Sequence, residues 1–288
     1  MVVRGRGRVT AGGVALGLLV SGCAAQERPE LRDDLRSLSG EARQADDPGW
    51  ARAALRRAAR ALAEAGGAKV RTSMETVSGG TRLTIHGAGG YDFARPAGEL
   101  TVLVPADAAG ATEHRAVTEV FVPGALFMKN RGAGVPDDKW VRLSTPAFAD
   151  GNLLTNGATD PLAAAELLGG AREVTYMRDE QVDGVRVRHY WGTIDLGQAA
   201  RAAPERDRDA LAVAARGFSS GTVRFDAYLD RQGLLRRLSH RFGVVRGGPA
   251  APMTVVSTLD LYDFGSKFDV ALPASADIYA GTVGSPRK

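Results

Sequence analysis

Residues Gly217 to Gly221 spell G-x-S-x-G, the pattern that surrounds the nucleophilic serine of α/β-hydrolases. That serine works from a strained turn at the edge of a sheet, which requires a strand before it and a helix after it. Around Ser219 the sequence predicts the reverse order, with a helical stretch first and an alternating strand second. With 36 glycines in 288 residues, such a match also arises readily by chance. We therefore expect a helix-to-strand loop here rather than a catalytic serine.

Other chemically suggestive residues lack the partners that their chemistry needs. The triplet Asp263-Phe264-Gly265 matches the magnesium-binding triplet of protein kinases, but no glycine-rich loop, strand lysine or H-R-D loop precedes it. Asp137-Asp138 has no calcium-loop spacing around it. No metal-ligand spacing connects the four histidines, which are His86, His114, His189 and His240. We expect no enzyme, no metal and no cofactor.

Cys23 is the only cysteine of the chain, and its surroundings predict covalent attachment of lipid. Three arginines among the first eight residues lead into the apolar run Val14–Val20 and then Ser21-Gly22. This order is typical of an export signal, and the run is shorter than the roughly 20 residues that span a bilayer. A cysteine directly after the small pair looks like the lipobox of bacterial lipoproteins, in which the thiol is diacylated and becomes the new N-terminus. The alternative is an ordinary secretory signal that contains a cysteine.

The lipobox divides the chain into three segments. We expect residues 1–22 to be a signal peptide and diacylglyceryl Cys23 to hold the mature chain at the extracytoplasmic face of the cell membrane. Residues 23–47 are rich in Arg, Asp, Glu and Gln and have almost no large apolar side chains, which predicts a flexible tether. As a coil this tether spans roughly 25–30 Å. Residues 48–288 form the folded domain.

The overall composition argues against nucleic-acid binding. The chain carries a net charge of +4, but removal of the three leader arginines leaves 34 basic and 33 acidic residues. A mature charge near +1 has no basic footprint for a nucleic acid. A hydrophobic content of 44% is enough to build a core, which must form without a disulfide.

A helix opens the predicted domain. Asp47 suits the N-cap and Pro48 the first helical position, and the helix runs from Trp50 to about Ala65 before Gly66-Gly67 stops it. Apolar residues at three- and four-residue spacing form one stripe. The opposite side carries Arg52, Arg56, Arg57 and Arg60. This basic face could contact anionic lipid headgroups or simply be solvated.

The remainder alternates in the manner of β-strands. Asp183-Gly184 signals a hairpin, and helical patterns interrupt the strands at Pro161–Leu168, with Asp160 as the cap, and at Pro204–Arg216. Hairpin links predict an antiparallel, strongly curved sheet with one apolar face. On one strand we expect Val185, Val187 and Trp191 to face inward. The strands are expected at residues 70–77, 81–86, 100–104, 117–122, 126–129, 139–143, 173–181, 185–193, 222–229, 234–244 and 253–262.

Several motifs resemble a known family. Besides the lipobox and the Ala-rich first helix, Ala125–Lys129 with Lys139–Leu143 resembles a "glyM…WvrL" stretch, and Tyr228–Arg236 resembles a "v-W-v-D-x-x-G-l-l-r-k" hairpin. The tail from Tyr262 to Pro273 resembles a "Y-x-D-f-G…v…v…P" ending. In their order and spacing these pieces are similar to the LppX/LprG-type actinobacterial lipoproteins, relatives of the LolA/LolB carrier superfamily. The resemblance covers about residues 48–280.

The resemblance implies an α+β fold, an antiparallel half-barrel of about eleven strands with helices covering the concave face. It also implies an apolar cavity for a lipid or lipoglycan that is carried in the cell envelope. The other hypothesis is a sensory or scaffold lipoprotein that docks an unknown protein partner on the curved sheet without a ligand. From alternation, the candidate cavity residues are Leu83, Ile85, Leu100, Val102, Phe121, Phe127, Val223, Phe225, Leu238 and Phe242.

Overall fold

The computed structural model describes residues 47–105, 114–130, 134–145, 153, 160–244 and 253–281, all within the compact unit Ala42–Lys288. The expected signal peptide, Cys23 and the expected tether up to residue 46 lie outside the described residues. No helix in the described ranges is both long and apolar enough to cross a membrane.

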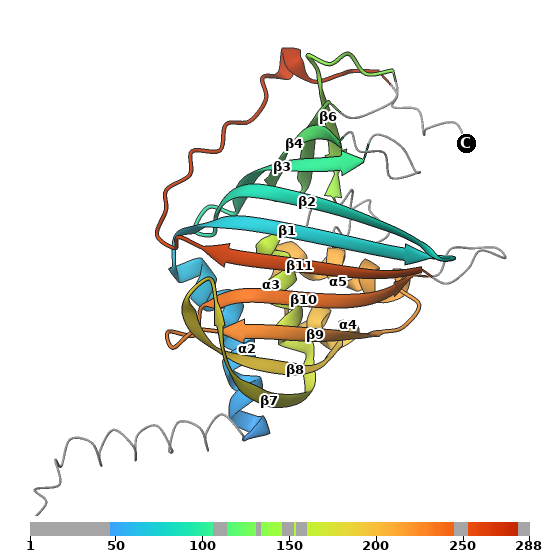
Figure 1. Cartoon of the computed structure of the whole chain (residues 1–288). Coiled ribbons are helices and arrows are strands. Elements are labelled where there is room, and N and C mark those ends of the chain that lie inside the picture. The colour runs from blue at the N-terminus through green and yellow to red at the C-terminus, as the bar shows by residue number, and fades with distance from the viewer. Residues whose placement is uncertain are drawn as a thin grey trace, which may run out of the picture. The chain divides into compact units, whose positions relative to one another are not determined.

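The described strands form one antiparallel sheet of eleven strands that does not close, as the sequence predicted (Figure 1). Its order is β6-β5-β4-β3-β2-β1-β11-β10-β9-β8-β7, so the first and last strands of the chain pair at its centre. The strands are β1 (Gly67–Ser78), β2 (Thr81–Asp92), β3 (Ala97–Pro105), β4 (His114–Val122), β5 (Ala125–Lys129), β6 (Trp140–Ser144), β7 (Ala171–Val182), β8 (Val185–Asp195), β9 (Thr222–Leu229), β10 (Leu235–Val244) and β11 (Met253–Tyr262).

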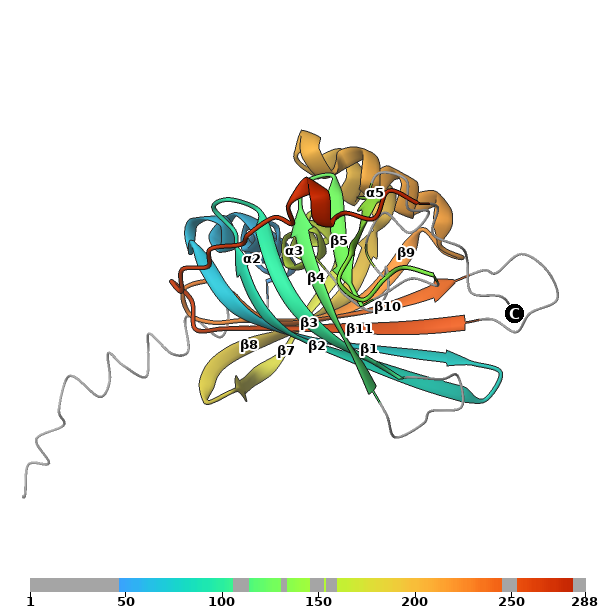
Figure 2. The same ribbon diagram turned by 90° about the horizontal axis from the view of Figure 1, so that it is seen from above.

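Helices cover the concave face of this curved sheet (Figure 2). They are α2 (Pro48–Glu64), α3 (Pro161–Glu166), α4 (Leu196–Ala202) and α5 (Glu205–Gly217), with a short 3₁₀ turn at Leu167–Gly170. The predicted caps of the first two are confirmed, because Asp47 and Asp160 accept hydrogen bonds from the backbone amides that follow them. The sequence did not predict α4. Its seven residues are too few to show a helical period, and they include a glycine.

The core lies between the helices and the concave face. Helix α2 buries Ala51, Leu55, Ala58 and Leu62 completely. Strand β9 shows the predicted alternation, with Val223, Phe225, Ala227 and Leu229 buried in the same core. The alternation of apolar residues therefore identifies the covered face on this strand.

On β8 the predicted facing is wrong. The register pairs Arg188 with Leu229 and Trp191 with Asp226, so Arg188 and Tyr190 lie on the concave side and Trp191 lies on the convex side. The Trp191 side chain is 38% exposed. Both faces of β8 carry apolar residues, so alternation within the strand is ambiguous and only pairing with β9 decides its facing.

A second, smaller apolar cluster lies on the convex side. It consists of Val120, Ala125 and Phe127, and it is covered by Val270 and Ile278 of the segment after β11. This C-terminal strap (residues 263–281) runs from the end of β11 to β6, where the Tyr279 amide donates a 2.8 Å hydrogen bond to the Trp140 carbonyl (Figure 1).

The strap also constrains a glycine of β2. A Cβ atom placed on Gly90 would collide with the Phe268 ring. The lack of a side chain at Gly90 therefore allows this ring to pack against the sheet. We expect Gly90→Ala to lower the free energy of unfolding by about 1–3 kcal/mol through overpacking. Urea denaturation measures this cost.

A double-mutant cycle provides the control for this prediction. In a Phe268→Ala background the ring is absent, so the same Gly90→Ala change should cost clearly less. An equal cost in both backgrounds would mean that the strap does not press on Gly90.

Candidate functional site

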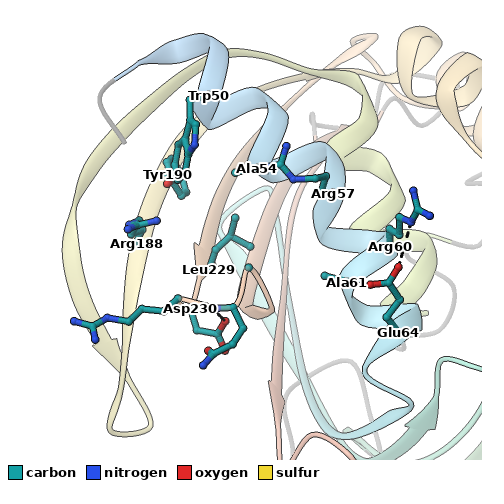
Figure 3. A pocket seen from close by; sticks show the side chains of 13 residues that line it. Trp50, Ala54, Arg57, Arg60, Ala61, Glu64, Arg188, Tyr190, Leu229 and Asp230 are labelled. Atoms are coloured by element: carbon teal, nitrogen blue, oxygen red, sulfur yellow. Dashed lines mark hydrogen bonds and ion pairs between the residues drawn. The ribbon is translucent and has the colours of Figure 1, made fainter. Parts of the chain in front are cut away.

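A pocket of about 430 Å³ opens between α2, β8 and the turn that joins β9 to β10 (Figure 3). This size lies within the range of small-molecule sites. The pocket is called the α2–β8 pocket below. Its lining residues are Trp50, Ala54, Arg57, Arg60, Ala61 and Glu64 from α2, Arg188 and Tyr190 from β8, and Leu229, Asp230, Arg231, Gln232 and Gly233 from β9 and the turn.

Local sequence explains why these residues converge. On α2, three- and four-residue spacing places the lining side chains along one flank of the helix, beside its buried stripe. The turn is held by Asp230, whose carboxylate accepts hydrogen bonds from the amides of Gln232 (3.0 Å) and Leu234 (2.9 Å). Gly233 adopts φ +81°, a conformation that glycine permits without strain.

The inner part of the pocket is apolar. The rings of Trp50 and Tyr190, the side chain of Leu229 and the methyl groups of Ala54 and Ala61 supply this surface. The small alanines keep the space open, because a larger side chain at either position would fill it.

The rim is basic. Four arginines line the pocket against two carboxylates, and both carboxylates have partners: Glu64 pairs with Arg60 at 3.2 Å, and Asp230 pairs with Arg236 at 2.7 Å. Among the described residues, Arg57 and Arg231 form no ion pair. The guanidinium of Arg188 lies 5.3 Å from the centre of the Trp50 ring. The pocket therefore combines apolar walls with an excess of positive charge.

Tyr190 places a protonated hydroxyl in this wall. Burial raises the pKa of Tyr190 to about 12, although the neighbouring Arg188 charge acts in the opposite direction. The hydroxyl is buried. It remains a donor at neutral pH.

A second space of about 320 Å³ lies on the other flank of α2. Its lining includes alanines of α2, α3 and α4, together with Arg56, Arg60 and Arg206. Glu166 lies at its base in contact with Arg206, and burial together with the neighbouring Asp207 raises the pKa of Glu166 to about 9. Three arginines against one glutamate give this space, too, an excess of positive charge.

The predicted cavity residues lie elsewhere. Nine of the ten belong to, or pack against, the core on the concave face. Phe127 is on the opposite face, in the small cluster under the C-terminal strap, because Val120 and Phe127 pair across β4 and β5. None of the ten lines the α2–β8 pocket or the second space beside α2, and their role as cavity walls stays a prediction.

Sequence reasoning missed the α2–β8 pocket. The arginines of α2 were visible as one basic face, but the expectation that Val187 faces inward turns its neighbour Arg188 to the outside of the sheet. Only the pairing of Arg188 with Leu229 places it beside Trp50. The available signal was that Arg188 and Tyr190 are two residues apart on one strand and therefore share a face.

The other sequence candidates have structural explanations. Ser219 follows α5 and precedes β9, the order opposite to a nucleophile elbow, and its amide donates to the Gly243 carbonyl. Asp263 pairs with Lys69 at 2.8 Å in the turn after β11. No cluster that could hold a metal ion occurs among the described residues. His240 is buried, and burial lowers the pKa of His240 to about 3, so it stays neutral.

Comparison with known proteins returns distant matches among solved structures. No protein-family model and no curated protein matches the chain. Among solved structures, LprF from Mycobacterium bovis matches with 13% identity and a TM-score of 0.43 over 78% of this chain and 97% of that one. The lipoprotein LppX from Mycobacterium tuberculosis matches with 13% identity and a TM-score of 0.43 over 76% and 98%.

A LolA superfamily protein from Nitrosomonas europaea also matches, with 12% identity and a TM-score of 0.32 over 79% of this chain and 96% of that one. These matches agree with the resemblance to LppX/LprG-type and LolA-like proteins seen in the sequence. They are distant, and what those proteins bind does not transfer to this chain through them.

His189 generates a pH prediction. Its two ring nitrogens lie 2.9 Å from Glu180 and 2.7 Å from Asp226, on the convex face. Burial opposes protonation, but the bonds to the two carboxylates outweigh it and raise the pKa of His189 above 6.5. This stabilisation is complete below the unfolded pKa and is lost as pH rises through the folded one.

We therefore expect His189→Gln to lower the free energy of unfolding more at about pH 5.5 than at about pH 9. Urea denaturation at both pH values measures the difference, with the exposed His86→Gln as control. A loss of stability that is the same at both values, or larger at high pH, would contradict this assignment.

Proposed function

We propose that this chain is an extracytoplasmic lipoprotein, anchored to the cell membrane through diacylated Cys23, that binds an anionic amphiphile for carriage in the cell envelope. One observation carries the proposal: the α2–β8 pocket joins an apolar interior to a rim of arginines whose neighbouring carboxylates are already paired. This arrangement fits a guest with an apolar part and an anionic group. It calls for no catalysis.

The apolar wall supplies the affinity. Each methylene that moves from water to the walls formed by Trp50, Tyr190 and Leu229 gains about 0.8 kcal/mol. Tryptophan and tyrosine suit a ligand that crosses from a dry to a wet region, because each joins an apolar ring to a polar group.

The basic rim supplies orientation and specificity. Arginine binds carboxylate and phosphate groups through paired hydrogen bonds, and Arg57 and Arg231 have no acidic partner among the described residues that would compete. The anionic group of the guest would therefore lie at the mouth between α2 and the β9–β10 turn, with its apolar part toward Leu229.

A protein-docking role is the second candidate. It is favoured by the convex face, where the exposed Trp191 lies beside Arg224 and Asp226. Crosslinking in intact cells distinguishes the two: a specific protein adduct at Trp191 together with a lipid-free pocket favours docking. Lipid that co-purifies with the mature chain favours the carrier.

A larger side chain that fills the α2–β8 pocket should weaken the binding of a ligand there. Ala61→Phe places a ring in the α2–β8 pocket, whereas Ala63→Phe, two residues along the same helix, lies on the other flank. We expect Ala61→Phe to weaken binding of a fluorescent fatty acid at least about 10-fold and to reduce the lipid that co-purifies.

Ala63→Phe is the control and should bind as the parent chain does. Equal effects of the two substitutions, or a mature chain that carries no lipid and ignores the fluorescent probe, would exclude this pocket as the site.

The rim predicts a preference for negative charge. Compared with the parent, the double variant Arg57→Gln, Arg231→Gln should bind a fatty acid more weakly by about 10-fold or more, since charge-assisted hydrogen bonds contribute about 1.5–3 kcal/mol each. Binding of the neutral monoacylglycerol of the same chain length should change little. Titration of both probes measures the ratio. Parallel losses for both probes would show that the arginines act through packing and not through charge.

A further inference from the structure

Three of the four exposed arginines of α2 have no acidic partner among the described residues. On the sheet and its turns, many arginines pair with carboxylates, as in Arg186 with Asp179, Arg178 with Glu180 and Arg237 with Asp260. The arginine ridge, defined as Arg52, Arg56, Arg57 and Arg60, contains one such pair, between Arg60 and Glu64. The other three ridge residues form no ion pair with any described residue.

The ridge lies directly opposite the buried side of α2. All four arginines are exposed, whereas Ala51, Leu55, Ala58 and Leu62 are fully buried against the core. At about 100° per residue the four side chains occupy an arc of roughly 140°. This arc faces away from the core.

The ridge also separates the two pockets. Arg57 and Arg60 line the α2–β8 pocket, and Arg56 and Arg60 line the space on the other flank. In Figure 3 the side chain of Arg60 projects from α2 on the side away from Leu229. Arg231 extends the same positive surface across the pocket mouth. Positive charge therefore surrounds both openings.

We propose that the arginine ridge docks on the anionic headgroups of a phospholipid bilayer. The argument is charge complementarity together with the position of α2 in the chain. Helix α2 begins directly after Asp47, and residues 24–46 alone separate it from Cys23, the expected site of acylation. A chain held at a membrane by Cys23 presents this helix first.

Docking in this orientation places both pocket mouths at the headgroup layer. A lipid could then pass between the bilayer and the α2–β8 pocket without crossing bulk water. The inference rests on the Cys23 anchor of the proposed function, but the docking requires no bound guest and is therefore tested separately from ligand binding.

Vesicle binding tests this inference. The probe is the mature chain from residue 23 with Cys23→Ser, so that no acyl group anchors it. We expect sedimentation with vesicles of equal parts phosphatidylglycerol and phosphatidylcholine, loss of binding at high salt, and no sedimentation with phosphatidylcholine alone.

A double variant, Arg52→Gln with Arg56→Gln, removes ridge charges without touching the α2–β8 pocket. Each arginine near an anionic surface contributes about five-fold to partitioning, so we expect a loss of about 30-fold. The matched control is Arg142→Gln with Arg241→Gln, two exposed sheet arginines that have no ion pair with described residues. It should change partitioning by less than about three-fold.

Three outcomes would overturn the inference. They are no sedimentation with phosphatidylglycerol vesicles, equal losses in the two double variants, and equally tight binding of the chain to an acidic polypeptide. Fatty-acid titration in the absence of vesicles runs in parallel. A chain that does not bind vesicles but still binds the fatty acid would refute docking through the arginine ridge. The α2–β8 pocket would then remain the proposed ligand site.

Discussion

The apolar concave face of the sheet must be shielded from water, and most of the remaining architecture follows from this requirement. A sheet that curves as this one does exposes its inner face along its whole width unless helices exclude water from it. Helix α2 meets the requirement with a stripe of Ala51, Leu55, Ala58 and Leu62, of which two are small enough to let the helix approach the strands closely. Helices α3 to α5 cover the rest.

The pockets arise where that coverage ends. Beyond its buried stripe, α2 presents alanines and arginines to its neighbours, and alanine methyl groups do not fill the gap to β8 on one side or to α3 and α4 on the other. The same helix therefore closes the core and leaves two open spaces along its flanks. Because its outer face is arginine-rich, both spaces acquire a positive rim.

Charge pairing around α2 leaves positive charge at the pocket mouths. The nearby carboxylates are bound by other groups: Asp230 by Arg236 and the turn amides, and Glu166 by Arg206. On the convex side, Glu180 and Asp226 bind His189, and Asp260 pairs with Arg237. The convex arginines Arg142 and Arg241 also have no acidic partner among the described residues, but the unpaired arginines around α2 are the ones that line the two pockets beside this helix.

Local signals in the sequence were sufficient for the elements and the fold class. Three signals act over a few residues: capping by Asp47 and Asp160, the Asp183-Gly184 turn and period-two alternation. The first helix, the number of strands and their antiparallel pairing could therefore be predicted. The lipobox at Cys23 remains a prediction, since it lies outside the described residues. Only the tertiary structure decided which face of β8 is covered, that Phe127 lies under the C-terminal strap, and that Arg188 meets Trp50. These outcomes depend on register between strands and on packing between distant segments, which no stretch of sequence encodes by itself.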